Sequence, residues 1–302
     1  KEYWNRTAFV NGPTGHLVGA FVLKPNSSDF SSTSPFNLFA SDDEWSAPIM
    51  TEIGPDGNAW VIDWYNYIVQ HNPTPAGFKT GKGNAYETPV RDKKRGRIYR
   101  VVYKNKSGKP FSLENASPEL LVSTLANPTM LWRKQAQRLL VERGKPDVER
   151  GLIALVNDHS VDEIGLSVGA IHALWTLKGL GLVLPSNKPV FAAVIKALQH
   201  PSAGVRRNAI QVLPNADEAT SALLVSKILF DDHPQVRLAA LLALSDLPAS
   251  KDAAATLLGV MNAGFGSDRW LNDASISAAA NQGRYLISVA AGLSKELDET
   301  SL

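Results

Sequence analysis

A tight turn followed by an apolar strand is the feature of this sequence that most restricts its fold. The run reads Ile53-Gly54-Pro55-Asp56-Gly57-Asn58-Ala59-Trp60-Val61-Ile62-Asp63, and after a long insertion the chain continues with Gly96-Arg97-Ile98-Tyr99-Arg100-Val101. A Pro-Asp-Gly turn before a strand that ends on Asp, followed by a second strand, is typical of a β-propeller blade. A propeller needs about four to eight blades. Because there is room for only about two blades before the pattern turns helical near Ser117, we expect the last segment of a propeller.

The first 110 residues predict a β-rich unit with one long loop. Sixteen of the 24 aromatic residues lie before Pro110, where Gly, Pro and Asn turns separate short runs of strand-forming residues. These runs cover residues 8–10, 17–23, 37–40, 59–64 and 97–103. Residues 65–94 are polar and rich in Gly, Pro and Asn, and a loop of that length in a compact domain usually has a function.

After Ser117 the sequence becomes helical and repeats itself. The segment Val205–Leu213 returns 31 residues later as Val236–Leu244, with Val, Arg, Ala, an aliphatic residue and Leu in the same places. Weaker copies occur at Trp132–Leu140 and around Ala170–Leu174, and each copy follows a short turn. Helix pairs that repeat every 30–45 residues or so are typical of HEAT-type α-solenoids, in which neighbouring pairs share one apolar core.

Three specific expectations follow from this repeat. Leu213 and Leu244 are expected to be buried at equivalent positions of stacked helices. The Arg of the repeated Val-Arg pair (Arg206, Arg237) is expected to tie neighbouring repeats together through an Asp, for which Asp231 or Asp232 is the candidate. His200 and His233 precede Pro in equivalent turns and are expected to be structural.

The two patterns together predict a β + α multidomain chain. We expect residues 1–110 to form the last blades of a partial β-propeller, built of antiparallel sheet and carrying the long loop 65–94. Residues 111–302 are expected to form an α-solenoid of four HEAT-like repeats, with a degenerate cap from about Ala253 onward. The length of 302 residues agrees with roughly two domains of about 150 residues each.

Composition removes several classes of site. The chain has no cysteine, which excludes a disulfide, a thiolate nucleophile, an iron–sulfur cluster and a Cys-x-x-Cys-His haem attachment. Metal binding is not expected, because the acidic run Asp42–Glu44 reads more readily as a solvated turn. No stretch approaches the roughly 18 apolar residues of a membrane span, and Lys1–Arg6 has no apolar signal-peptide core.

A basic run between Arg91 and Lys109 raises the question of nucleic-acid binding. It holds nine Lys or Arg residues and one Asp, although the net charge of the whole chain is only +2. Strand alternation within residues 97–103 divides these charges between two faces, so they do not form one stripe. We expect a solvated edge strand protected by its charge and no nucleic-acid partner.

The candidate binding residues lie where the predicted strand enters the long loop. Asp63, Trp64, Tyr65 and Asn66 end the strand, and His71 and Asn72 follow within the loop. Asp and Asn would bond the hydroxyls of a sugar or a quinone while Trp and Tyr stack on it; alternatively, all four shape a structural turn. We expect an ordered loop with Asp63, Asn66, His71 and Asn72 turned inward beside a polar cleft.

His16 and His71 are the only histidines of the β-rich part. Either could serve as the general base of a sugar or alcohol dehydrogenase, or each could be a turn residue, which is the favoured interpretation. His16 therefore belongs to the candidate site with Asp63, Trp64, Tyr65, Asn66, His71 and Asn72. The sequence identifies no catalytic residue.

Several longer strings of this sequence are distinctive. The most specific are Asp63-Trp64-Tyr65-Asn66, Gln70-His71-Asn72-Pro73-Thr74-Pro75 and Gly81-Lys82-Gly83-Asn84-Ala85-Tyr86-Glu87-Thr88. Further strings are Pro13-Thr14-Gly15-His16-Leu17, Ala40-Ser41-Asp42-Asp43-Glu44-Trp45, Gly54-Pro55-Asp56-Gly57, Gly96-Arg97-Ile98-Tyr99-Arg100 and Asp268-Arg269-Trp270-Leu271. Together they resemble a family of large secreted bacterial proteins with names such as membrane-bound dehydrogenase or haem-binding protein, and the resemblance covers nearly the whole chain.

The resemblance implies a sorbosone-dehydrogenase-like propeller followed by HEAT repeats in a periplasmic or extracellular protein. In this family pyrroloquinoline quinone (PQQ) or haem would be the cofactor of the full-length protein, whereas we expect no cofactor in this chain. We therefore expect the binding or scaffolding portion of a propeller–HEAT protein that acts on or near carbohydrate, with a protein or glycan partner. The alternative is the C-terminal fragment of a quinone- or haem-linked sugar or alcohol dehydrogenase. Substrate and oligomeric state stay open.

Overall fold

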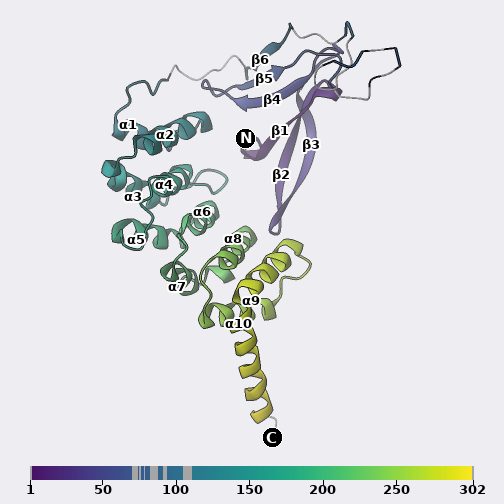
Figure 1. Cartoon of the computed structure of the whole chain (residues 1–302). Helices are drawn as coiled ribbons and strands as arrows, with labels where there is room; N and C mark the ends of the chain where they lie inside the picture. Colours follow the sequence, from purple (N-terminus) through teal and green to yellow (C-terminus); the bar gives the residue numbers. More distant parts are fainter. Residues whose placement is uncertain are drawn as a thin grey trace. The chain divides into compact units, whose positions relative to one another are not determined.

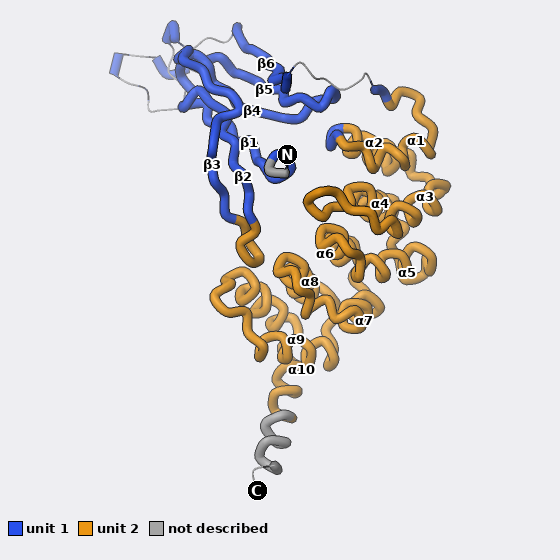
Figure 2. Tube along the Cα trace, turned by 180° about the vertical axis from the view of Figure 1, so that it is seen from behind, with its two compact units in different colours: residues 1–24, 31–112, 129–131 blue, residues 25–30, 113–128, 132–302 orange. Residues whose placement is uncertain are grey.

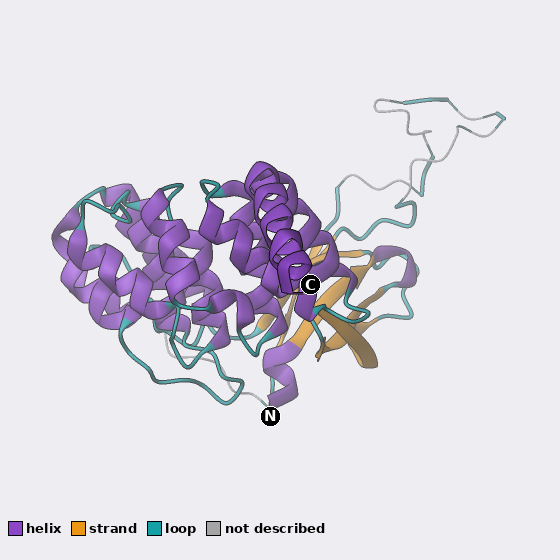
Figure 3. Cartoon of the chain, turned by 90° about the horizontal axis from the view of Figure 1, so that it is seen from below, coloured by secondary structure: helices purple, strands orange, loops and turns teal. Residues whose placement is uncertain are grey.

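The computed structural model of the chain describes residues 2–69, 74, 76–77, 79–81, 88–90, 94–104 and 111–300. The chain divides into two compact units, coloured blue and orange in Figure 2. The first unit comprises residues 1–24, 31–112 and 129–131, and the second comprises residues 25–30, 113–128 and 132–302. Strands build the first unit, whereas helices dominate the second, as the colours of Figure 3 show.

The first unit contains two antiparallel sheets of three strands each among the described residues. One sheet has the order β1-β2-β3 and the other β4-β5-β6 (Figure 1). The bounds are β1 Thr7–Gly12, β2 Leu17–Asn26, β3 Asp29–Ala40, β4 Pro48–Ile53, β5 Ala59–Asp63 and β6 Arg97–Val101, with short 3-10 helices at Glu2–Arg6 and Pro13–Gly15. β1 lies against β4, and the Thr51 hydroxyl donates to the Asn11 side chain over 2.7 Å.

The central strand β5 alternates between a buried and an exposed face. Val61 and Asp63 are buried, whereas Ile62 between them is exposed. Ile62 pairs with Met50 on β4 and with Ile98 on β6, so a row of three exposed aliphatic side chains crosses the sheet. β5 thus alternates between buried and exposed side chains, and this row forms an exposed apolar stripe across one face of the sheet.

The Pro-Asp-Gly turn before β5 is held by the carboxylate of Asp56. Its two oxygens accept hydrogen bonds from the Trp60 indole (3.0 Å), the Asn58 amide nitrogen (3.2 Å) and the Asn58 side chain (2.9 Å). The guanidinium of Arg100 lies 2.5 Å away. These contacts, with the Trp60 bond foremost, hold the pKa of Asp56 well below its usual range. Gly54 must be glycine, because an added Cβ would lie 2.3 Å from the Trp60 ring.

The propeller expected from the sequence is not shown by the structure. Propeller blades have four strands and pack around a channel, but the two described sheets have three strands each and are open. The local turn and strand pattern correctly predicted β5, its Pro-Asp-Gly turn and β6, whereas β4 at Pro48–Ile53 was not among the predicted strands. Whether a sheet joins a closed propeller depends on contacts with neighbouring blades, and a local sequence pattern does not specify those contacts.

The second unit is a stack of helix pairs (Figure 1). Over residues 111–300 the helices are α1 Pro118–Thr124, α2 Met130–Arg143, α3 Glu149–Val156, α4 Val168–Gly179, α5 Lys188–Ala197, α6 Ala203–Val212, α7 Asp217–Val225, α8 Pro234–Asp246, α9 Lys251–Ala263 and α10 Arg269–Thr300, with 3-10 turns at Pro146–Val148 and Ile228–Phe230. Ser117, Asn187, Ser202 and Ser250 cap helix N-termini by accepting a backbone N–H bond. Within the described part of the chain, none of the helices has both the length and the apolar character needed to cross a membrane.

The predicted repeat is confirmed by burial at equivalent positions. Leu213 and Leu244 are 9% and 0% exposed, as expected from their offset of 31 residues. The weaker copies follow the same rule, because the Ala and Leu of each copy are buried. The four alanines are Ala136, Ala170, Ala209 and Ala240, all at most 1% exposed, and the leucines of the weaker copies are Leu140 and Leu174, both 0% exposed. These alanines and leucines belong to one core that α2, α4, α6 and α8 share, and α6 packs closely against both α4 and α8.

The predicted Arg–Asp tie is also confirmed, with Asp231 as the partner. Arg206 forms a two-pronged ion pair with Asp231 at 2.7 and 2.8 Å and donates to the carbonyls of His200 and Pro201 in the preceding turn. Arg133 in the weaker copy donates to carbonyls six and five residues before it, as Arg206 does. The arginine therefore has the same local role in both copies.

Polar side chains also join successive second helices. The His172 ring on α4 lies 2.7 Å from Gln137 on α2, and the Trp175 indole donates to Asn208 on α6 over 2.6 Å. Burial, together with the charge of Arg133, lowers the pKa of His172 to about 4. His172 is therefore neutral at neutral pH, and these bonds add specificity to an apolar stack.

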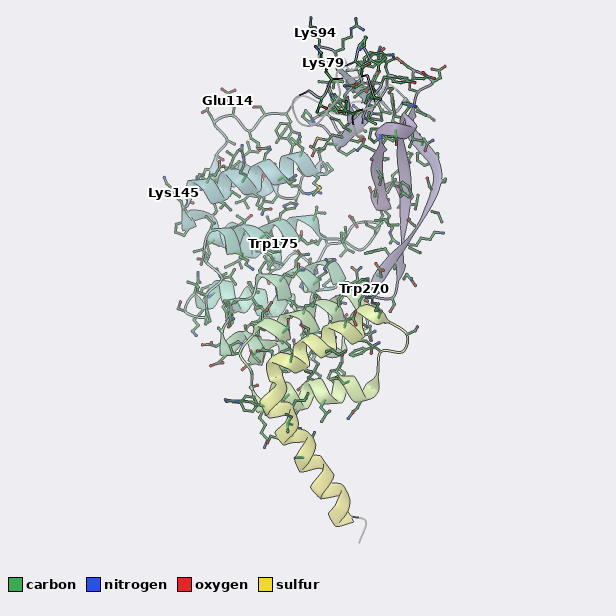
Figure 4. The ribbon with its side chains drawn as sticks, turned by 45° about the vertical axis from the view of Figure 1, so that its right-hand side comes forward. Lys79, Lys94, Glu114, Lys145, Trp175 and Trp270 are labelled. Carbon is green, nitrogen blue, oxygen red and sulfur yellow. The ribbon has the colours of Figure 1, made fainter. Side chains whose placement is uncertain are left out.

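The tip between β2 and β3, residues 25–30, belongs to the second unit. There the Ser28 amide and hydroxyl donate to Asp268 over 2.9 and 2.7 Å, and the Trp270 indole donates to Asp29 over 3.1 Å. Burial alone would raise the pKa of Asp268, but the hydrogen bonds from Ser27, Ser28 and the Leu271 amide outweigh it and hold that pKa well below its usual range. Asp268, just before α10, and Trp270, in the first turn of α10 and labelled in Figure 4, therefore hold this tip through hydrogen bonds.

Candidate functional site

Asp63 is the centre of the hydrogen-bond network at the end of β5. Its side chain is 1% exposed, and one oxygen accepts from the backbone amides of Ala47 (2.6 Å) and Tyr65 (2.8 Å). The other oxygen accepts from the Ser46 hydroxyl over 3.0 Å. The Trp64 amide in turn donates to the Ala47 carbonyl over 3.0 Å. Asp63 therefore joins the end of β5 to the segment before β4, which is the structural role that the turn interpretation assigned to it.

His16 is bonded to the same segment. Its Nδ1 lies 2.6 Å from the Ser46 carbonyl, which makes this nitrogen the donor, and its own carbonyl accepts from the Ser41 amide over 3.0 Å. The backbone of His16 is left-handed, with φ of 56°, at the end of the short helix Pro13–Gly15. The two hydrogen bonds and the left-handed backbone give His16 a structural role in this turn, while the Nδ1 bond leaves Nε2 as the ring's acceptor nitrogen.

Three aromatic rings gather beside this network: Trp45, Tyr65 and Tyr67, here called the aromatic cluster. The Trp45 ring centroid lies 6.0 Å from that of Tyr65 and 6.0 Å from that of Tyr67. The guanidinium of Arg97 on β6 stacks over Tyr65, 3.5 Å from its ring centroid. Residues from three separate stretches of the chain thus meet at one place.

Charged groups fix the cluster from one side. Arg97 pairs with Asp43 over 3.2 Å and donates to the Tyr99 hydroxyl over 3.2 Å. The Trp45 backbone amide, the Tyr65 hydroxyl and Arg97 lower the pKa of Asp43. Burial and the hydrogen bond to Asp43 raise the pKa of Tyr65. At neutral pH the site therefore holds a carboxylate and a guanidinium beside a neutral phenol.

The remaining predicted site residues divide into exposed, buried and undescribed ones. Trp64 is 38% exposed, and Tyr67 of the aromatic cluster is 48% exposed. Asn66 is buried, and its side-chain oxygen accepts from the Ile68 amide over 3.2 Å. His71 and Asn72 lie outside the described residues, so the predicted cleft and the inward position of these two side chains stay predictions.

Sequence reasoning missed Asp43, Trp45 and Arg97 as parts of this site. Asp43 and Trp45 stand in a string already noticed for its acidic character, but Arg97 is more than thirty residues from Tyr65. Among the described residues, no group of three or more His, Asp or Glu side chains is placed to hold a metal ion. Asp43, in the acidic run Asp42–Glu44, pairs with Arg97.

Two family models match parts of the chain. Residues 1–105 match a domain of unknown function (DUF7133), and residues 191–272 match HEAT repeats. No curated protein matches the chain. The HEAT match begins within α5 and ends within α10, and it includes the two copies with the 31-residue offset. The first 105 residues are thus similar to a domain of unknown function, and the solenoid of the second unit is similar to HEAT repeats.

Proposed function

We propose that this chain is a binding and scaffolding module whose first unit holds a glycan at the aromatic cluster. The observation that carries this proposal is the exposed Tyr67 ring beside Trp45, backed by the buried network of Asp63. Sugars bind proteins through C–H faces that stack on aromatic rings and hydroxyls that bond nearby polar groups. A cluster held by hydrogen bonds before the ligand arrives loses little entropy on binding.

The contacts assign different roles to the aromatic residues. The Arg97 guanidinium covers one face of the Tyr65 ring. In this proposal Tyr65 therefore supports the neighbouring rings and does not itself stack on the sugar. Tyr67 of the aromatic cluster is 48% exposed, and Trp64, which precedes Tyr65 and is not part of the cluster, is 38% exposed. We assign both as the stacking residues of this proposal. Arg97 and Asp43, exposed by 42% and 33%, can bond sugar hydroxyls at the edge.

The second unit provides the scaffolding part of the proposed function. HEAT repeats suggest a protein-interaction role, and solenoids of this type present extended surfaces to partners. The first unit, in this proposal, is the last part of a propeller, and the exposed row of Met50, Ile62 and Ile98 is the face on which a preceding blade would pack. A periplasmic or extracellular location and a role near carbohydrate come from the resemblance alone and are part of the same proposal.

A polysaccharide array tests the glycan site. Tyr67→Ala and Trp64→Ala should each lower retention of the full chain by about tenfold or more, because removing a stacking residue at the centre of a site removes much of the binding energy. Tyr103→Ala, at an exposed tyrosine outside the cluster, and Trp270→Ala in the second unit are the matched controls and should leave retention unchanged. Equal retention by all four variants, or retention of no glycan by the wild-type chain, would contradict the proposal.

The alternative function is a fragment of a quinone- or haem-linked sugar or alcohol dehydrogenase. A dye-reduction assay with added PQQ separates it from the binding module. Reduction of dye by any aldose or polyol above the buffer rate would support the dehydrogenase and overturn the purely binding role. We expect no turnover by this chain.

A further inference from the structure

The ends of three second helices line an open pocket in the second unit. The pocket has a volume of about 330 Å³. Lys178 lies in the last turn of α4, Gln211 in the last turn of α6, and Asp246 is the last residue of α8. α6 contacts both α4 and α8, so the three helices are neighbours in the stack (Figure 1). Trp175, labelled in Figure 4, lies one turn before Lys178 on α4.

The C-terminal end of α6 is already capped by a cation. The Lys178 ammonium donates to the Gln211 carbonyl over 2.7 Å and lies 5.2 Å from the Trp175 ring centroid. A helix C-terminus carries partial negative charge on its unpaired carbonyls, which a cation stabilises. Lys178 therefore already balances the partial negative charge that the end of α6 brings to the pocket.

In the part of the chain that the structure describes, the carbonyls at the C-terminal end of α8 accept side-chain hydrogen bonds from neutral amides and not from a cation. The Asp246 carbonyl accepts from the neutral Asn215 side chain over 2.8 Å. Within the described part of the chain, no Lys, Arg or His side chain forms an ion pair with the Asp246 carboxylate. A full negative charge and the negative end of a helix thus coincide at this side of the pocket.

The floor between the two polar ends is apolar. Leu213, Ala239 and Leu247 are buried there, while Leu242 is 46% exposed at the rim. A ligand for this pocket needs an apolar stem and a positively charged end. Lys and Arg side chains have this construction, since their methylene stems cover apolar surface while the charged group stays polar.

We propose that this pocket receives a Lys or Arg side chain from an extended peptide segment of a partner protein. The stem lies along Leu242 and Ala239, and the charged group lies at Asp246 and the end of α8. Lys178 on the opposite side disfavours a second basic residue next to the first. This site is separate from the aromatic cluster and goes beyond the glycan function, so either can fail without the other.

Fluorescence polarisation with the full chain tests this pocket. The probes are four labelled heptapeptides, Gly-Ser-Leu-Xaa-Leu-Ser-Gly, with Arg, Lys, Gln or Glu at the central position. In about 0.15 M salt, where long-range attraction is screened, the Arg and Lys peptides should bind about three- to tenfold more tightly than the Gln peptide, and the Glu peptide more weakly still. Asp246→Asn should remove this preference. Leu242→Ser should weaken the binding of the Arg peptide and of the Gln peptide by a similar factor.

Asp252→Asn is the matched control, because Asp252 is an exposed aspartate on α9 outside the pocket. It should keep the full preference for Arg and Lys. The proposal is overturned if the Arg peptide binds no better than the Gln peptide, or fails to bind at millimolar concentration. It is also overturned if the preference survives in Asp246→Asn or disappears equally in Asp252→Asn.

Discussion

Replacing Leu244 by Ala is expected to lower the free energy of unfolding of the second unit by about 2–5 kcal/mol. Leu244 is fully buried in the core that α8 shares with its neighbours, so truncation leaves a cavity in a closely packed interior. Leu213→Ala, at the equivalent position of the preceding repeat, should have an effect in the same range. Urea or thermal unfolding followed by the helical circular-dichroism signal measures both.

Val225→Ala is the control for these two substitutions. Val225 is 83% exposed at the end of α7, so its truncation should change stability by less than about 0.5 kcal/mol. Near-neutral effects at both Leu213 and Leu244 would contradict the assignment of these residues to equivalent core positions.

Replacing Asp63 by Ala is expected to destabilise the first unit by about 3–5 kcal/mol, because it leaves three donors without their acceptor. The donors are the backbone amides of Ala47 and Tyr65 and the Ser46 hydroxyl, and Ser46 and Ala47 are fully buried. Hydrogen exchange read by mass spectrometry over residues 41–69 should show faster exchange across this segment. Asp63→Asn keeps an acceptor oxygen and should have a smaller effect.

Asp42→Ala is the matched control, because Asp42 is an exposed aspartate of the segment that Asp63 holds. It should leave hydrogen exchange over the same residues nearly unchanged. If Asp63→Ala left the exchange rates unchanged but abolished glycan retention, Asp63 would be a ligand-contacting residue and its structural role would be wrong.

The repeat could be predicted from sequence because each core position recurs in a fixed local context. Ala209 and Leu213 reappear as Ala240 and Leu244. A helix of 3.6 residues per turn places Ala240 and Leu244 on one buried face of α8, and Leu213, the C-cap residue of α6, is buried as well. The tie from Arg206 to Asp231 was predictable for the same reason, since the two residues lie at the starts of successive second helices, Arg206 in α6 and Asp231 in the turn before α8. Local periodicity and stacking together determine this unit.

The first unit was harder to predict because its key contacts join distant stretches. A strand pattern identifies β5 and its turn, but it does not specify whether the sheet closes with others into a propeller. Asp63 was named from the sequence as a candidate binding residue or a turn residue, but its partners Ser46 and Ala47 come from another segment. The stacking of Arg97 on Tyr65 likewise depends on the β5–β6 register, which no motif in the sequence specifies.

The proposed glycan site is tested most directly by hydroxyl-radical footprinting of the full chain with an oligosaccharide that the array retains. Bound sugar should lower the oxidation of Trp64 and Tyr67, which are 38% and 48% exposed. Tyr103 and Trp270, which are 64% and 46% exposed, should be oxidised at the same rate with and without sugar. Protection of Tyr103 or Trp270 without protection of Trp64 and Tyr67, or no protection at saturating sugar, would contradict a glycan site at the aromatic cluster.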